Sequence, residues 1–87
     1  MIKVNFSESF MRAYKKKIKN NKELEERFWN KLKLFTLNPY DQSLKTHKLS
    51  RNNLWSFSLN YEIRIIFSFA DDSNIIFLNI GTHDEVY

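Results

Sequence analysis

The sequence predicts an α+β fold in which two N-terminal helices pack on one face of a small antiparallel sheet. Three observations predict it: a short alternating segment at the start, two apolar stripes with helical spacing, and three alternating runs in the second half. The expected order is strand, helix, helix, strand, strand, strand, an α+β layer with the helices on one face of the sheet. Residues 1–87 are expected to form a single domain, because the chain is well below the size at which cores divide.

The first strand and helix are expected before residue 20. Residues 2–6 alternate between apolar and polar side chains, which is typical of a strand. Ser7 is expected to cap a helix that runs from Glu8 to about Lys19. An apolar residue recurs at every fourth position of that helix: Phe10, Tyr14 and Ile18.

The second helix is expected after the break at Asn20–Asn21. Asn20 and Glu23, three positions apart, approximate a capping box. The helix should end before Pro39, because the residue before a proline is pushed out of the helical region. One apolar stripe follows its length: Leu24, Phe28, Leu32 and Phe35. The short break between the helices predicts an antiparallel hairpin.

Three strands are expected in the second half, over residues 55–59, 62–69 and 75–80. A polar turn at residues 71–74 separates the last two, so the three strands predict an antiparallel meander. Polar side chains alternate with the apolar ones of the first two strands: Ser56, Ser58, Asn60 and Arg64. We expect them on the sheet face that the helices do not cover.

Composition and charge limit the classes of function. Fourteen Lys and Arg against ten acidic residues give a net charge of +4, which mildly favours polyanions or acidic proteins as partners. The chain has no cysteine, which excludes disulfides and thiolate metal sites, and we expect neither metal nor cofactor. The N-terminus is unlike a signal peptide and the apolar runs are too short to span a membrane, so a cytoplasmic protein is expected.

Two segments could bring catalytic side chains to the sheet. Residues 45–48 (Lys-Thr-His-Lys) precede the meander, and residues 81–83 (Gly-Thr-His) close it. If both lie near one edge, two imidazoles, Arg64 and two lysines would line a shallow basic groove. RNA transesterification needs such a set: a base for the 2′-OH, an acid for the leaving 5′-oxygen, and cations for the phosphate. Spacing alone favours the simpler interpretation of each histidine as a solvated loop residue.

Several stretches resemble a known family. They are residues 38–41 (Asn-Pro-Tyr-Asp), 44–50 (Leu-Lys-Thr-His-Lys-Leu-Ser), 55–58 (Trp-Ser-Phe-Ser), 64–67 (Arg-Ile-Ile-Phe) and 80–87 (Ile-Gly-Thr-His-Asp-Glu-Val-Tyr). In register over nearly the whole chain, they resemble the RelE/StbE-type toxins of the RelE/ParE superfamily, and the His-Lys-Leu and Gly-Thr-His motifs resemble its YafQ branch. The resemblance implies a metal-independent endoribonuclease that cleaves mRNA on the ribosome by 2′-OH transesterification and is inhibited by a cognate antitoxin protein.

The resemblance also implies roles for individual residues. His83 matches the general acid of the YafQ branch, and His47 matches a candidate base or substrate ligand. Arg64 matches the arginine that holds the scissile phosphate, and Tyr87 matches the terminal aromatic residue that stacks on or orients the nucleotide. Two lysines would make auxiliary phosphate contacts: Lys45 and Lys48.

The chain departs from the family at three places. Ser58 stands where the YafQ branch has another histidine, Glu62 is nearest to its catalytic aspartate, and residues 50–53 lack the usual glycine. These departures leave the general base open, and with it the alternative of an inactive homologue. A second alternative is a non-enzymatic inhibitor of DNA gyrase, as in the ParE toxins. His47 and His83 favour the nuclease, since a gyrase inhibitor needs no acid–base residues.

Overall fold

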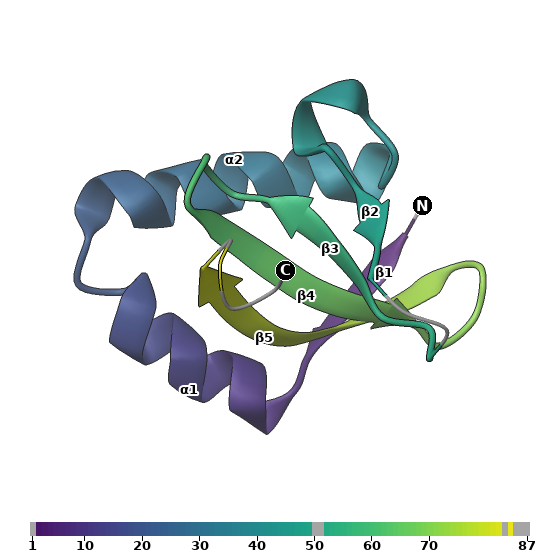
Figure 1. Ribbon diagram of the computed structural model, residues 1–87, viewed down its shortest axis with the longest axis horizontal. Coiled ribbons are helices and arrows are strands. Elements are labelled where there is room, and N and C mark those ends of the chain that lie inside the picture. The colour runs from purple at the N-terminus through teal and green to yellow at the C-terminus, as the bar shows by residue number, and fades with distance from the viewer. Residues whose placement is uncertain (1, 50–51, 83, 85–87) are drawn as a thin grey trace.

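The computed structural model describes residues 2–49, 52–82 and 84. Two helices pack on one face of a five-stranded sheet (Figure 1), which confirms the α+β fold class predicted from the sequence. The helices are α1 (Glu8–Lys17) and α2 (Lys22–Leu37). The strands are β1 (Lys3–Phe6), β2 (His47–Lys48), β3 (Trp55–Ser58), β4 (Ile63–Phe69) and β5 (Asn74–Thr82).

The order of strands across the sheet is β1-β5-β4-β3-β2. Strands β3, β4 and β5 form the expected antiparallel meander. The expectation of a purely antiparallel sheet is wrong, because β1 pairs with β5 in parallel. The parallel strand supplies hydrogen-bond partners along what would otherwise be the open edge of β5: Lys3 N donates to Ser73 O, and Ser7 N donates to Phe77 O.

A short strand, β2, and a 3₁₀ turn, η1 (Gln42–Leu44), extend the expected order of elements. His47 and Lys48 pair with Ser56 and Trp55 of β3 in an antiparallel register. A two-residue strand is too short to give a periodic sequence signal, so the sequence predicted only a connecting segment here. The consequence for function is that His47 belongs to the sheet edge and not to a loop.

The helix ends follow local hydrogen bonding. Ser7 caps α1 as predicted: its Oγ accepts from Phe10 N at 3.0 Å. The predicted cap of α2 is wrong by one residue, since Asn21 and not Asn20 accepts from Leu24 N, at 3.1 Å. The second helix ends as expected before Pro39, where the backbone of Asn38 becomes extended.

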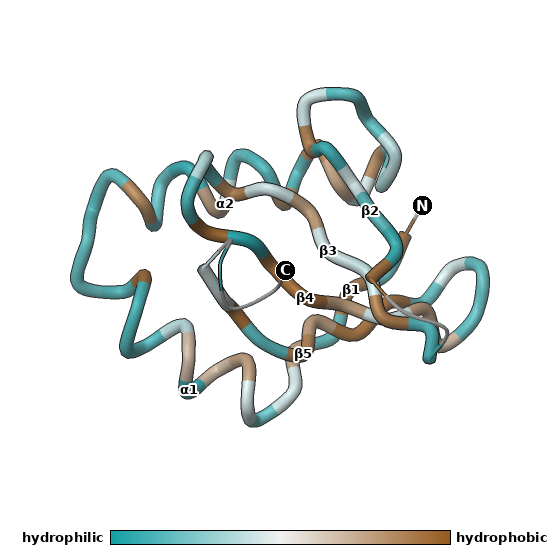
Figure 2. Tube along the Cα trace, viewed as in Figure 1, coloured by the Kyte–Doolittle hydropathy of each residue, from teal (hydrophilic) through white to brown (hydrophobic). Residues whose placement is uncertain are grey.

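The core lies between the helices and the sheet and is built largely of phenylalanine rings. Phe77, in strand β5 between β1 and β4, is completely buried. Its ring centroid lies 5.3–6.4 Å from six others: Phe6, Phe10, Phe28, Phe35, Phe57 and Phe67. Figure 2 shows the strands rich in apolar residues and the connecting loops hydrophilic. No helix in the described part of the chain is long and apolar enough to cross a membrane.

Candidate functional site

The outer face of the sheet, opposite the helices, carries the polar side chains of β3 and β4. Phe57 and Ile65 belong to the core, so their neighbours Ser56 and Arg64 point to the other face, as predicted. Ser58 lies opposite Arg64 in the register of β3 and β4. Its hydroxyl donates to Asn60 O at 2.7 Å and so helps to form the β3–β4 turn.

Arg64 is fixed at the centre of this face. Its Nε donates to Ser56 Oγ at 2.8 Å, and its Nη2 donates to Lys45 O at 2.7 Å. Only 6% of Arg64 is exposed. The expectation that Arg64 lines a shallow open groove is therefore wrong. A buried guanidinium needs hydrogen-bond acceptors, and these two ensure a fixed orientation. Arg64 thereby joins β4 to β3 and to the segment that precedes β2.

His47 lies on the same sheet face as this arginine, two strands away across β3. It pairs with Ser56 across β2 and β3, and residues directly opposite in an antiparallel pair place their side chains on the same face. His47 is exposed at the sheet edge, whereas Ser56 and Arg64 are buried. The structure thus places His47, Ser56 and Arg64 on the same outer face, with Ser56 between the exposed imidazole and the rigidly held guanidinium.

The two predicted auxiliary lysines have different surroundings: Lys45 precedes β2 and Lys48 is its last residue. Lys45 follows η1 in a left-handed backbone conformation (φ 51°), and this turn presents its carbonyl to Arg64 while its side chain remains exposed. Lys48 pairs with Trp55, and its Nζ lies 5.9 Å from the centroid of that indole. Because Trp55 packs on the helix side, the structure does not bring Lys48 to Arg64.

Glu62 is exposed in the β3–β4 turn, two residues before Arg64. The side chain of Asn60 shapes this turn: its Oδ1 accepts from Glu62 N at 2.9 Å and from Ile63 N at 2.7 Å. The backbone of Glu62 is therefore fixed while its carboxylate faces solvent. The structure places Glu62 directly before the first residue of β4, the strand that carries Arg64.

The last described part of β5 lies beside Arg64, since Gly81 is its partner and Thr82 pairs with Ile63. Two other predicted residues, His83 and Tyr87, lie outside the described residues. The expectation that the two ends of the meander share one edge is wrong: β3 and β4 separate β2 from β5, and β1 covers the far side of β5. That separation is about 14 Å at about 4.8 Å per strand. Arg64, on β4, lies between β2 and β5: it pairs with Gly81 of β5 and donates a hydrogen bond to Lys45 O before β2.

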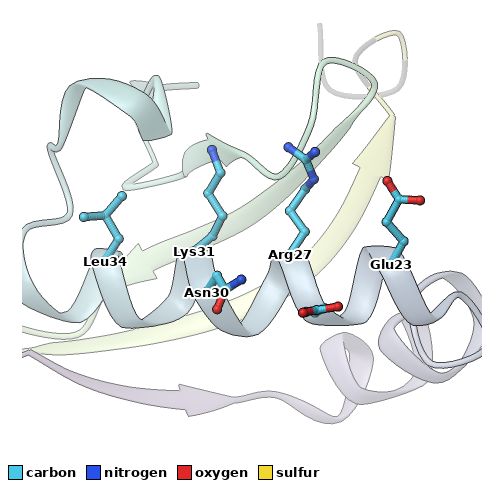
Figure 3. Close-up of a pocket in the computed structure, with 6 residues that line it drawn as sticks. Glu23, Arg27, Asn30, Lys31 and Leu34 are labelled. Atoms are coloured by element: carbon cyan, nitrogen blue, oxygen red, sulfur yellow. The ribbon is translucent and has the colours of Figure 1, made fainter.

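A second group of cations, which the sequence did not indicate, lies on α2 near Lys45. Lys31 Nζ donates to Ser43 O at 3.0 Å in η1. Burial lowers the pKa of Lys31, and the neighbouring charges of Arg27 and Lys45 lower it further. Arg27 and Lys31 extend from the same side of α2 (Figure 3). They line a groove of about 420 Å³. Only tertiary contact between α2 and η1 places these cations near Lys45.

Metal-ligating side chains do not gather in the described part of the chain. There, no group of three or more His, Cys, Asp or Glu is placed to hold a metal ion. The polar groups at the site are instead imidazole, guanidinium, hydroxyl and ammonium. These groups can bind a phosphodiester and transfer protons.

Comparison with known proteins finds similarity among solved structures but not among family models or curated sequences. Among solved structures, YafQ from Escherichia coli has a TM-score of 0.77 at 18% identity, covering 100% of this chain and 99% of that one. A YoeB–YefM complex from Staphylococcus aureus has a TM-score of 0.73 at 26% identity over 95% and 98%. The YoeB/ParE toxin from Agrobacterium tumefaciens has 0.76 at 14% over 94% and 99%.

The chain has the RelE/ParE toxin fold. The family resemblance of the sequence thus agrees with the likeness in fold. At these identities the likeness establishes the RelE/ParE architecture, while the chemistry depends on the residues of this chain.

Proposed function

We propose that this protein is the toxin of a toxin–antitoxin pair. Two solved structures of the same fold are described as complexes of two proteins. They are YoeB–YefM from S. aureus and DinJ–YafQ from E. coli, the latter with a TM-score of 0.71 at 18% identity. The net charge of +4 suits an acidic partner. The cognate antitoxin would be a second protein that binds this chain and blocks its activity.

We further propose that the toxin cleaves mRNA on the ribosome without a metal ion. The observation that carries this proposal is the fixed guanidinium of Arg64 on the same sheet face as the exposed His47, with Ser56 between them. Arginine binds phosphate oxygens with a planar pair of donors, and its rigid support removes the entropic cost of orienting it on the substrate. A solvent-accessible imidazole on the same face can exchange protons with the RNA.

The reaction follows from these groups. A base, His47 in this proposal, takes the proton of the 2′-OH, and the oxygen attacks the adjacent phosphorus. The bond to the 5′-oxygen breaks, and an acid protonates this leaving oxygen; His83 is our candidate. The products are a 2′,3′-cyclic phosphate and a 5′-hydroxyl. Arg64 and Lys45 would stabilise the phosphate charge in the transition state.

Two further residues have supporting roles in this proposal. Tyr87 would stack on or orient the nucleotide, as the family resemblance implies. Glu62 is the alternative proton acceptor, because its carboxylate is exposed at the start of the strand that carries Arg64. Replacing His47 and Glu62 separately would identify the base: only the residue that accepts the proton should change the pH dependence of cleavage.

The direct test uses purified protein and ribosomes loaded with a defined mRNA, with the new RNA ends mapped by primer extension. We expect His83→Ala to reduce the cleavage rate by about 10²–10⁴-fold, the usual effect of losing a general acid. Tyr61→Ala is a control, since this side chain is 92% exposed in the β3–β4 turn. A folded His83→Ala protein with the wild-type rate would remove His83 from the mechanism.

Pulse labelling after induction distinguishes the alternatives. Loss of protein synthesis with cleaved mRNA supports the nuclease. Loss of DNA synthesis without cleavage would replace it by a gyrase inhibitor of the ParE kind. Normal growth together with antitoxin binding would indicate an inactive homologue that retains only its partner.

A further inference from the structure

A cluster of aromatic side chains lies at the edge of the sheet, apart from Arg64. Tyr40, Trp55 and Phe69 pack together with ring centroids 5.5–6.3 Å apart. Trp55 and Phe69 border the core, but Tyr40 is 58% exposed. The core explains the first two rings. It does not explain why a third large ring extends their aromatic surface into solvent.

These rings line a pocket of about 460 Å³. This volume lies within the range of about 300–1,000 Å³ that is usual for small-molecule sites. Polar side chains line it as well: Lys48, Asn53 and Asp72. The Lys48 ammonium lies 5.9 Å from the Trp55 ring centroid, so a cation stands at the mouth of an aromatic pocket. Flat aromatic surfaces with an adjacent lysine are how proteins hold unpaired bases of a nucleic-acid strand.

The pocket and the Arg64 face adjoin each other across β2. His47 is on the outer face with Ser56, and the next residue, Lys48, is on the other side with Trp55. This edge strand is only two residues long. A single strand of RNA bound at His47 and Arg64 could therefore pass over β2 and reach the aromatic pocket with a nearby base.

We propose that the pocket formed by Tyr40, Trp55 and Phe69 binds an unpaired base of the RNA strand, close to the scissile nucleotide. This inference rests on the proposed nuclease function and adds a base-binding subsite to it. The base stacks on the exposed ring of Tyr40 and the edge of the cluster, and Lys48 neutralises a flanking phosphate.

Asp72 gives the pocket a preference among bases. Its carboxylate accepts hydrogen bonds only, whereas the neighbouring Asp71 carboxylate already accepts from Ser73 N and Asn74 N. Adenine, cytosine and guanine each present an exocyclic amino group, whereas uracil has none and offers only its ring N3–H between two carbonyl oxygens, which the carboxylate repels. The carboxylate also repels phosphate, so the base and not the backbone enters. We therefore expect uracil to bind most weakly.

The test is a nuclear magnetic resonance titration of the whole protein with 2′-O-methyl tetranucleotides, which cannot be cleaved. The indole signals of Trp55 and Trp29 report separately, and Trp29, which is 44% exposed on α2, is an internal control. We expect the Trp55 signal to shift and that of Trp29 to remain. Adenine and cytosine oligonucleotides should bind more tightly than uracil ones.

Substitutions decide whether the ring is responsible. Tyr40→Ala should weaken binding by about 5- to 150-fold, the effect of losing one stacked base, whereas Tyr40→Phe should bind normally. Tyr61→Ala is the matched control, an exposed tyrosine outside this pocket. Equal affinity of Tyr40→Ala and wild type, or no shift of Trp55 with any oligonucleotide, overturns the inference. A Trp55 shift caused by the antitoxin but not by RNA also overturns it and makes the pocket a protein-docking site.

The two proposals fail in different ways. If the base subsite is wrong but the nuclease is right, Tyr40→Ala cleaves ribosome-bound mRNA normally and His83→Ala does not. If the nuclease is wrong, the Trp55 titration still measures base binding on its own. The titration therefore does not depend on catalytic activity.

Discussion

The two faces of the sheet are built on different physical principles. The helix-covered face is a continuous apolar layer, in which Phe77 contacts rings from both helices and from neighbouring strands. The outer face carries a buried cation, Arg64, with oxygen acceptors from Ser56 and Lys45. Apolar burial is non-directional, whereas a buried charge depends on a few oriented partners.

Because of this difference, the outer face is the better place for a site that depends on the orientation of polar groups. On the helix side, many similar apolar contacts together stabilise the fold, so stability there does not depend on the geometry of any one polar group. On the outer face one guanidinium orients the segment before β2 and, through it, the position of His47. A small change there should affect activity more than stability, and a large change in the core should do the reverse.

Phe77→Ala should have the largest effect on stability. Removing a fully buried ring that packs against six others leaves a cavity, and Phe→Ala in a core typically reduces the free energy of unfolding by about 3–5 kcal/mol. Urea denaturation of the purified protein, followed by circular dichroism, measures this loss. Phe69→Ala is the control at a half-buried ring and should lose clearly less. Equal losses would mean that the core is not centred on Phe77.

Arg64→Lys, on the outer face, should reduce cleavage more than stability. Lysine keeps the charge but cannot donate to Ser56 Oγ and Lys45 O together, so we expect a stability loss of about 1–3 kcal/mol. Cleavage of ribosome-bound mRNA should fall much further, since the planar phosphate donor is lost. Ser56→Ala, which removes one acceptor, is the graded control. Normal cleavage by a folded Arg64→Lys protein would show that Arg64 contributes only its positive charge to cleavage, or nothing.

The sequence predicted the helix-covered face well and the outer face only in part. Periodicity identified the stripes of Phe10, Phe28 and Phe57, because burial on one side imposes a regular spacing. Strand β2 and the parallel pairing of β1 arise from contacts between distant segments, which no local pattern records. The burial of Arg64 was missed for the same reason: its acceptor Lys45 O is 19 residues away.

Two aspartates with the same local role provide a smaller test. Asp41 Oδ1 accepts from Ser43 N and Oγ beside η1, and Asp71 Oδ1 accepts from Ser73 N in the β4–β5 turn. These hydrogen bonds hold the pKa of both carboxyls below the usual value. Each carboxylate therefore stabilises the fold above about pH 4, and this contribution is lost as the pH falls through the depressed pKa.

We expect Asp41→Ala to lower cleavage and Asp71→Ala to leave it unchanged. Only η1 leads directly to Lys45, whose carbonyl binds Arg64. Both variants should weaken the dependence of unfolding on acid pH, which denaturation between pH 2 and 6 would measure against wild type, roughly the range of carboxyl titration. If both variants cleave normally, the position of η1 does not control the site.

The smallest expected effect concerns the encounter with the antitoxin. With Arg64 buried, the exposed lysines near β2 are the cations that an acidic, partly disordered partner meets first. Association should slow as salt rises, because steering is screened beyond a Debye length of about 10 Å at 0.1 M, while dissociation should change little if apolar burial holds the complex. Stopped-flow measurements at two salt concentrations, with the product of the adjacent reading frame, test this. Lys45→Gln should reduce the association rate a few-fold at low salt, and Lys3→Gln, on β1 at the opposite edge of the sheet, should not. A salt-independent association rate would refute the steering alone, whereas no binding at all would exclude that protein as the antitoxin.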